Sequence, residues 1–396
     1  MTPPLSFRPF DADEHYYEAI DAFTRHVDRK MQKRAIQWVE INGRKRILVA
    51  GKLDRFIPNP TFDPITKPGA LEDYFRGRNP QGKTQAELFI GQIEKLRAEY
   101  RDRDARIAVL DQQGMEGALL FPTLGCGVEE PLRHDAEACH AALHGFNQWL
   151  HEDWGFAYQG RLFAVPMLTL MDPALAVRDL EWVLERGARV VYMRPAPVPK
   201  PTGSTSPGHT DHDPFWARCA EAGVTVAFHA ADSGYGRYAA AWEGARQMEG
   251  FRGHAFGMSA LPGRAVMDTF AALLVHGVFR RFPKLQVASI ENGSFWVPWL
   301  FTNLKKAFGQ MPDAFGHEDP RETFRRHVSV APYFEDDIPS LVDLVGAERV
   351  LYGSDFPHAE GLREPLDFVK ELDGLSAADV RAIMRENPRR LVQTAA

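Results

Sequence analysis

The chain of 396 residues has few features of an extracellular, membrane-bound or nucleic-acid-binding protein. Its three cysteines form an odd number without CxxC spacing, which excludes a disulfide framework and favours a reducing compartment. No basic and apolar leader opens the sequence, and no apolar run approaches the roughly 18 residues of a membrane span. The net charge of -6 and the scattered Lys and Arg residues offer no basic face. We therefore expect a cytoplasmic protein that binds neither membranes nor nucleic acids.

Short apolar runs and helical patterns alternate along most of the chain. The predicted strands are residues 7–15, 117–123, 162–168, 188–193, 224–229, 285–291, 327–331 and 349–352. Most of them are almost continuously apolar, as strands buried on both faces should be. This order predicts an α/β fold, a (β/α)₈ TIM barrel, with residues 1–396 as a single domain.

A long segment separates the first predicted strand from the second. Within it, Asn42-Gly43 lies between two strand-like runs, which indicates a β-hairpin because these residues readily adopt positive φ. A proline-rich loop follows at 57–69, and the pattern over 84–111 is helical. We expect residues 16–85 to be a hairpin-containing insertion that lies over the barrel mouth.

Polar side chains stand where several predicted strands end. These residues are Asp13, His15, Arg194, His229, Glu291 and Asp355. In a parallel barrel the loops at the C-terminal ends of the strands build the active site. Asp13 and His15 share one face of their strand, so they can chelate a metal together. One divalent cation would neutralise the carboxylates of Asp13 and Asp355 beside two neutral imidazoles. Without this cation the two carboxylates would repel each other.

The chain resembles the amidohydrolase-2 branch of the amidohydrolase superfamily, which contains aminocarboxymuconate semialdehyde decarboxylase. The most specific motifs are the opening Asp-Ala-Asp-Glu-His, the segment 277–285 and Tyr-Gly-Ser-Asp-Phe-Pro-His at 352–358. The resemblance covers most of the chain. It implies a metal-dependent barrel enzyme whose metal ligands are Asp13, His15, His229 and Asp355. Asp355 would also transfer protons.

One position departs from that family. Where the family usually has a His-Gly-Gly turn after the sixth strand, this chain has Glu291-Asn292-Gly293. The missing histidine normally positions or activates water or substrate. Glu291 could replace it as a base, bind the metal, or mark a changed chemistry, and Asn292 is a candidate substrate-binding residue.

Two further side chains are candidates for substrate binding. His358 lies three residues after Asp355, close enough to line the pocket, although it could instead cap the following loop. Arg194 could clamp a substrate carboxylate through its planar guanidinium, or it could neutralise Glu291 or Asp355.

The leading prediction is a metal-dependent hydrolase that acts through a metal-activated water on a small organic acid, amide, ester or lactone. Its catalytic residues would be Asp355, Glu291 and His229. Mixed carboxylate and imidazole ligands suit one divalent ion, Zn²⁺ first, with Mn²⁺ or Fe²⁺ as alternatives. The second prediction is a metal-dependent non-oxidative decarboxylase of an aromatic or unsaturated acid. A metal-free binding or structural subunit comes third. We expect a small-molecule substrate and allow for a homodimer.

Overall fold

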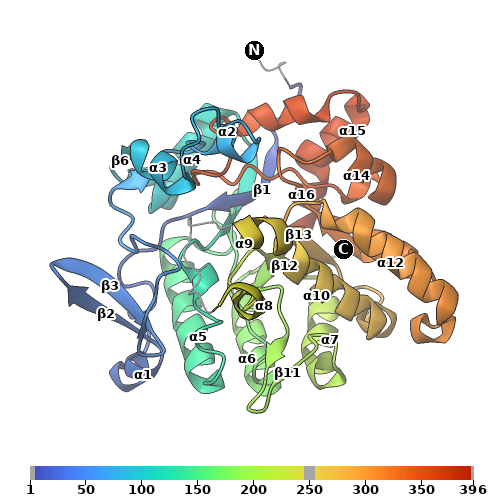
Figure 1. The fold of residues 1–396 in the computed structure, drawn as a ribbon, viewed down its shortest axis with the longest axis horizontal. Helices are drawn as coiled ribbons and strands as arrows, with labels where there is room; N and C mark the ends of the chain where they lie inside the picture. Colours follow the sequence, from blue (N-terminus) through green and yellow to red (C-terminus); the bar gives the residue numbers. More distant parts are fainter. Residues whose placement is uncertain (1–4, 245–254, 394–396) are drawn as a thin grey trace.

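Parallel strands form the centre of the molecule (Figure 1). The computed structural model describes residues 5–244 and 255–393. One sheet contains β1 (Phe10–His15), β7 (Gly117–Phe121) and β8 (Leu162–Ala164); the other contains β9 (Val190–Met193), β12 (Thr225–His229), β13 (Val287–Ile290) and β14 (Val328–Val330). All neighbouring strands in these two sheets pair in parallel. Their order along each sheet follows their order in the chain, as predicted.

Single bridges connect the two sheets. They are the parallel pairs Met167–Tyr192, Val330–Val350 and Glu14–Phe356. The last two involve the predicted eighth strand, residues 349–352, and the residues directly after it. This segment forms too few regular bonds to be assigned as a strand. The amide of Tyr352 donates instead to the carbonyl of Ile383, in the π-helical turn Ala382–Glu386. This turn divides the helix predicted near the C-terminus into α15 (Ala377–Arg381) and α16 (Asn387–Leu391).

Helices flank the strands, and Figure 1 shows α5, α6 and α7 side by side along one edge of the molecule. The helices between or after the central strands are α5 (Ala136–Asp153), α6 (Pro173–Leu184), α7 (Asp213–Ala222), α8 (Gly236–Glu243), α9 (Ala255–Ala260), α10 (Arg264–Val275), α11 (Val278–Arg281), α12 (Trp296–Gln310), α13 (Pro320–His327) and α14 (Ile338–Val345). A two-stranded ribbon of β10 (Val198–Pro199) and β11 (Ser204–Thr205) precedes α7. The carboxylates of Asp135 and Asp172 accept bonds from first-turn amides, which fixes where α5 and α6 begin.

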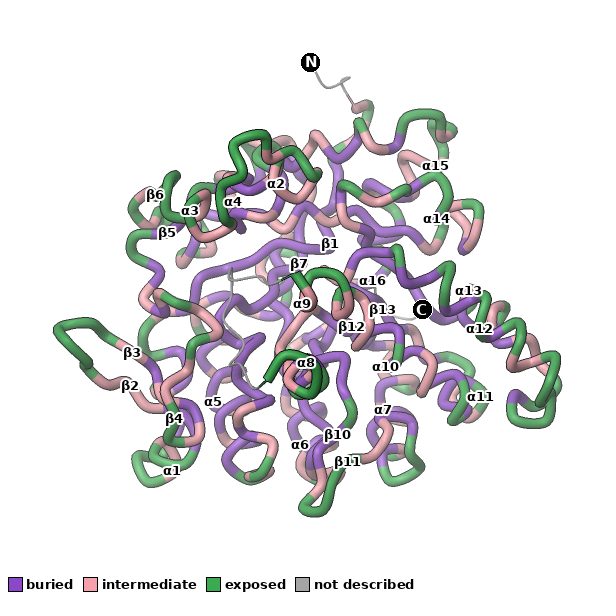
Figure 2. The backbone as a smooth tube through the Cα atoms, viewed as in Figure 1, coloured by how far each residue is buried: buried purple, intermediate pink, exposed green. Residues whose placement is uncertain are grey.

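The segment between β1 and β7 contains small elements. They are α1 (Arg29–Arg34), β2 (Ile36–Ile41), β3 (Arg44–Val49), β4 (Lys52–Leu53), β5 (Ile65–Thr66), α2 (Glu72–Phe75), α3 (Gln85–Gly91), β6 (Ile93–Glu94) and α4 (Arg103–Gln113). β2 and β3 pair antiparallel around Asn42 and Gly43, which both have positive φ. This hairpin projects at the edge of the molecule, and its tip is exposed (Figure 2). Residues later in the same segment, between 56 and 66, contribute to the cavity described below.

The helical pattern over 84–111 is realised only in part, as α3 and α4. Residues 93–94 form β6 instead, which pairs with β5, and α4 begins only at Arg103. Asp102 caps α4 through the amide of Ala105. β5 lies within the predicted proline-rich loop 57–69, and its pairing with β6 overrides the local helical pattern here.

A stretch at 255–275 is long and apolar enough, by length and composition only, to cross a membrane, and a third of it is buried. In the structure it is two helices, α9 and α10, separated by residues 261–263.

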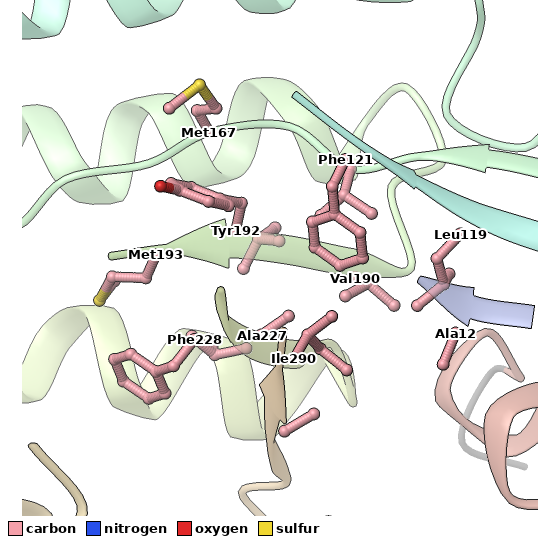
Figure 3. Packing of buried hydrophobic residues seen from close by; sticks show 14 of the residues in the cluster. Ala12, Leu119, Phe121, Met167, Val190, Tyr192, Met193, Ala227, Phe228 and Ile290 are labelled. Atoms are coloured by element: carbon pink, nitrogen blue, oxygen red, sulfur yellow. The ribbon is translucent and has the colours of Figure 1, made fainter. Parts of the chain in front are cut away.

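Apolar side chains fill the space between the central strands. Every residue of β7, β9, β12 and β13 is buried. Figure 3 shows buried side chains of several strands in this space, among them Phe121, Tyr192 and Ile290. Strands packed on both faces form a rigid platform, so side chains at their C-terminal ends are held in fixed positions.

An ion pair without solvent exposure anchors β1. Arg106 on α4 lies 2.9 Å from the Glu14 carboxylate, and both side chains are 0% exposed. The same guanidinium donates to the carbonyl of His15 at 2.7 Å and to that of Glu99 at 2.9 Å. Arg106 therefore fixes the end of β1 from behind, on the face opposite Asp13 and His15.

Arg106→Ala should lower the free energy of unfolding by about 3–5 kcal/mol, because it leaves a carboxylate buried and unpaired. Urea denaturation measures this loss. The control is Lys370→Ala, which removes a solvent-exposed pair with Asp367 and should cost at most about 1 kcal/mol. If both variants lost the same small amount of unfolding free energy, Arg106 would not anchor β1.

Candidate metal centre

Imidazoles and carboxylates converge at the C-terminal ends of the strands. The residues are Asp13 and His15 of β1, His229 of β12, Glu291 directly after β13, and Asp355, His358 and Glu360 in the loop after residue 352. Donor atoms of Asp13, His15, His229 and Glu291 all lie within 4.8 Å of one another, and so do those of Glu291, Asp355, His358 and Glu360.

Hydrogen bonds orient the rings of His15 and His229. Nδ1 of His15 lies 3.2 Å from the carbonyl of Pro122, and Nδ1 of His229 lies 2.9 Å from that of Ala230. A carbonyl oxygen can only accept, so Nδ1 carries the proton in both rings. The Nε2 lone pairs therefore face the centre, which is the usual arrangement of metal-binding histidines.

The ring of His358 is turned the other way. Its Nε2 lies 2.9 Å from the hydroxyl oxygen of Thr123, and that hydroxyl donates to the carbonyl of Tyr16 at 2.8 Å. Since Thr123 has given its only hydrogen to Tyr16, Nε2 of His358 must be the donor. Its Nδ1 then presents a lone pair, 2.7 Å from Oδ1 of Asp355.

The spacing of the inward-facing atoms fits a shared cation. Nε2 of His15 lies 3.5 Å from Asp13 Oδ1, 3.4 Å from Glu291 Oε2 and 3.2 Å from Asp355 Oδ1; Nε2 of His229 lies 3.5 Å from Asp13 Oδ1 and 3.0 Å from Glu291 Oε2. Ligands about 2.1 Å from one ion lie about 3.0 Å apart in an octahedron and about 3.4 Å apart in a tetrahedron. The separations between the inward-facing atoms correspond to these ligand–ligand distances.

Several of these atoms are buried without a hydrogen-bond partner among the described residues. They are Asp13 Oδ1, His15 Nε2, His229 Nε2, Asp355 Oδ1, His358 Nδ1 and Glu360 Oε2. Buried polar atoms are normally paired, and an unpaired group costs about 1–3 kcal/mol. Unpaired acceptors that point at a common centre fit a bound cation, so these residues suit a divalent metal.

The backbone at the centre adopts conformations that non-glycine residues seldom take. Glu291 has φ 54° and Asp355 has φ 58°. Gly353 allows the eighth segment to approach β1, since a Cβ there would lie 2.8 Å from that of Asp13. Asp11 joins the same two segments, because its carboxylate accepts from the amides of Asp13 at 2.9 Å and Ser354 at 3.1 Å. Strained backbone conformations of this kind are common at functional sites.

The crowded charges shift the pKa values of the centre. Burial, and then the charge of Glu291, raise the pKa of Asp355 well above its ordinary value. For Glu291, burial would raise the pKa, but the charges and hydrogen bonds of His229 and His15 outweigh it and lower the pKa. For His15, burial would lower the pKa, but the surrounding carboxylates outweigh it and raise the pKa. The group therefore attracts positive charge strongly.

A cavity of about 620 Å³ opens above the centre. Its walls are mostly apolar: Phe56, Ile57, Phe62, Ile65, Phe75, Phe89, Met258, Phe295, Tyr333 and Phe334 contribute to them. Within the described parts of the chain, no Lys or Arg lines it. Much of the wall comes from the segment between β1 and β7, although the hairpin residues 36–49 do not contribute.

Arg194 is not placed to clamp a substrate, and it does not neutralise Glu291 or Asp355. Its guanidinium lies 3.1 Å from the carboxylate of Glu129 and 2.8 Å from that of Glu130, and it donates to the carbonyl of Asp232. Its side chain is only 4% exposed and does not line the cavity. Arg194 directly follows β9, as predicted. Its N–H groups, however, are bound to the carboxylates of Glu129 and Glu130.

The side chain of Asn292 is also used within the fold rather than for substrate. It donates to the carbonyls of Phe228 at 3.0 Å and Ile290 at 2.7 Å, so it ties the ends of β12 and β13 together. His358, by contrast, lines the cavity beside Asp355.

Sequence reasoning missed Thr123, Glu360 and the structural role of Asp11. Thr123 directly follows the β7 region and could have been found by applying the strand-end argument to the second strand. Asp11 is fully buried, and burial raises its pKa. Nothing in the local sequence signals that Glu360 returns to the centre.

Several known proteins share this fold. The family model described as amidohydrolase (Amidohydro_2) matches residues 97–393. An amidohydrolase of Mycobacterium avium subsp. paratuberculosis K-10, map2389c, is 48% identical, with a TM-score of 0.93 over 98% of this chain and 99% of that one. The 2,6-dihydroxybenzoate decarboxylase of Rhizobium is 17% identical, with a TM-score of 0.56 over 73% of this chain and 88% of that one. A dihydroxybenzoic acid decarboxylase of Polaromonas sp. JS666, solved with manganese and 2-nitroresorcinol, is 18% identical, with a TM-score of 0.58 over 82% and 93%.

Parallel strands that carry an imidazole–carboxylate centre at their C-terminal ends define a class of (β/α)₈-barrel enzymes. Within that class, the chain belongs to the amidohydrolase family. The resemblance drawn from the opening and closing motifs is therefore confirmed. The decarboxylases share the fold at low identity, so they leave the reaction open.

We predict that protein purified without chelator contains a divalent metal and that the double variant Asp13→Ala, His229→Ala has lost it, because two of its ligands are gone. Elemental analysis measures the amount of metal bound per chain. Glu335→Gln is the matched control, since it removes a carboxylate from the same cavity outside the donor groups. Equal metal content in the wild type and the double variant would refute the assigned site.

Proposed function

We propose that the protein is a metal-dependent hydrolase of an uncharged ester, lactone or amide that carries a bulky apolar group. The observation that supports this most is the set of unpartnered donor atoms on the floor of an apolar cavity. A hydrolase needs a polarised carbonyl, an activated water and a proton carrier at one place, and this arrangement could supply all three.

Asp13, His15 and His229 would hold the metal, and Glu291 would complete the set. Asp355 lies 3.2 Å from Nε2 of His15 and is the further candidate ligand expected from the sequence. When bound, a divalent cation lowers the pKa of a nearby water and polarises a carbonyl. Two imidazoles with two carboxylates suit Zn²⁺ first, with Mn²⁺ or Fe²⁺ as alternatives.

Asp355 is the proposed proton carrier. Its carboxylate lines the cavity, and burial keeps its pKa high, which favours a carboxyl that can accept and return a proton. In the proposed reaction it takes a proton from the attacking water and passes it to the leaving group. His358, whose Nε2 donates to Thr123, turns its Nδ1 toward this carboxyl at 2.7 Å, so the protonated form of Asp355 can donate to it. Glu291 lies between two imidazoles, so it serves better as a ligand than as a base.

The cavity favours an uncharged substrate. Its aromatic walls offer contact to an apolar group, whereas its carboxylates repel anions. A carboxylate substrate would need a cationic partner, and the described lining provides none besides the metal. For this reason we place decarboxylation of an aromatic acid second, although the low-identity neighbours include decarboxylases.

We expect Asp355→Asn to reduce kcat by about 10²–10⁴-fold, the usual contribution of a general acid–base. The fold should persist because the amide is isosteric with the carboxylate. Steady-state kinetics measures the loss, while circular dichroism and metal content verify that the variant is folded and loaded. Near-normal turnover would overturn the role of Asp355.

Matched substrate pairs distinguish the two reactions. An apolar ester should be turned over at least about tenfold more efficiently than the same ester with an added carboxylate near the scissile bond, since repulsion costs more than about 1.4 kcal/mol. Hydrolysis should introduce labelled water oxygen into the product without gas release. Carbon dioxide released from aromatic acids, with no turnover of esters, lactones or amides, would establish the alternative.

A further inference from the structure

Arginine side chains gather at the end of the barrel opposite the candidate metal centre. Two neighbouring hollows, of about 540 Å³ and about 270 Å³, share Gln286 and Arg349 in their walls. Gln286 directly precedes β13 and Arg349 begins the predicted eighth strand, whereas Glu291 and Asp355 follow the other ends of these segments. We propose that the two hollows together form a binding site for a small phosphorylated molecule, separate from the reacting centre.

The two hollows are positively charged in a chain that is negative overall. Four guanidinium groups and two carboxylates line them within the described residues: Arg280, Arg326, Arg349 and Arg390, with Glu318 and Glu348. The excess is two positive charges, although the whole chain has a net charge of -6. A phosphate monoester carries about 1.5 to 2 negative charges at pH 7, so its charge complements these walls.

Arg349 provides the strongest observation. Its Nη1 donates to the side-chain oxygen of Gln286 at 3.1 Å and its Nη2 to the carbonyl of Arg326 at 2.6 Å, while its Nε is buried without a partner in the described structure. Burial, and then the charge of Arg390, lower the pKa of Arg349. No carboxylate of the described residues forms an ion pair with this guanidinium. A bound anion would supply the missing counter-charge and an acceptor for Nε.

Two further guanidinium groups are bound only to backbone carbonyls. Nη1 of Arg280 donates to the carbonyl of Ala314 at 3.1 Å, and Nη2 of Arg390 donates to that of Glu348 at 2.6 Å. Neither forms an ion pair within the parts of the chain that the structure describes. Because a guanidinium has five N–H groups, each of them retains donors for a ligand. Arg326, in contrast, pairs with Glu318, and both side chains are exposed.

An aromatic pair gives the larger hollow a surface for the organic part of the ligand. The rings of Phe279 and His327 both line it and stack with their centroids 4.7 Å apart. Nδ1 of His327 donates to the carbonyl of Leu285 at 2.7 Å, which fixes the orientation of its ring. The volume of this hollow falls within the range of about 300–1,000 Å³ that is typical of small-molecule sites.

The arrangement favours a phosphate over a carboxylate. A single carboxylate is satisfied by the two parallel N–H groups of one arginine. Here guanidinium groups come from separate elements, Arg280 from α11, Arg349 from the turn before the predicted eighth strand and Arg390 from α16. The three terminal oxygens of a phosphate monoester can accept bonds from several such groups at once.

Titration calorimetry of the full chain with phenyl phosphate tests the proposal. Arg349→Gln, and separately the double variant Arg280→Gln, Arg390→Gln, should bind at least about tenfold more weakly than wild type, because hydrogen bonds between charged groups are lost. Arg280 and Arg390 are exposed, so the double variant should fold even if Arg349→Gln does not. The control Arg44→Gln, Lys45→Gln removes two exposed positive charges from β3 and should bind like wild type. Benzoate should bind wild type at least about tenfold more weakly than phenyl phosphate does.

Three outcomes would overturn the phosphate site. One is the absence of phenyl phosphate binding to wild type at millimolar concentrations. Another is equal affinity in wild type and the double variant, which would place the ligand elsewhere, such as at the metal centre. Benzoate that binds as tightly as phenyl phosphate would contradict the assigned ligand class. All three leave the proposed hydrolase standing, because the substituted arginines lie at the opposite end of the strands.

Discussion

Negative charge gathered at the strand ends is the constraint on which the rest of this structure depends. At an effective dielectric constant of about 20, two like charges about 4 Å apart repel by about 4 kcal/mol, and this repulsion adds to burial in raising the pKa of Asp355. The described residues supply no ammonium or guanidinium to the cavity. We propose that a divalent cation relieves this repulsion, and the same cation would provide the chemistry.

Rigid elements of the surrounding structure hold the charged side chains of the centre in place. Arg106 ties β1 from behind through Glu14 and the carbonyl of His15. Asp11 joins β1 to the segment that carries Asp355. Glu291 and Asp355 adopt left-handed backbone conformations that neither residue would favour alone. The amide of Asp355 donates to the carbonyl of Asp13, and the hydroxyl of Tyr333 donates to the carbonyl of Glu291. Preorganisation of this kind keeps donor atoms at coordination distances before any ion arrives.

Much of the fold could be predicted from the sequence, because apolar runs between helical patterns report strands that are buried on both faces. The strand-end argument also located His15, His229 and Asp355, since side chains at one edge of a parallel sheet must meet. It could not predict where Arg194 would point, because that depends on Glu129 and Glu130, which follow a different strand. Glu360 was missed for a similar reason: its position follows from the backward turn at Gly361, a tertiary contact with no local pattern. The helical pattern over 84–111 is interrupted where β6 pairs with β5 across the insertion.

The central claim is that divalent cations complete this buried cluster, and the dependence of stability on metal tests it most directly. Thermal unfolding of metal-free wild type should shift to higher temperature as Mn²⁺ is added, by about 2.7 kcal/mol of stabilisation when free Mn²⁺ is about a hundred times its Kd. The double variant Asp13→Ala, His229→Ala should show little of this shift. An unfolding temperature of the wild type that does not respond to Mn²⁺, Zn²⁺ or Fe²⁺ would contradict the account.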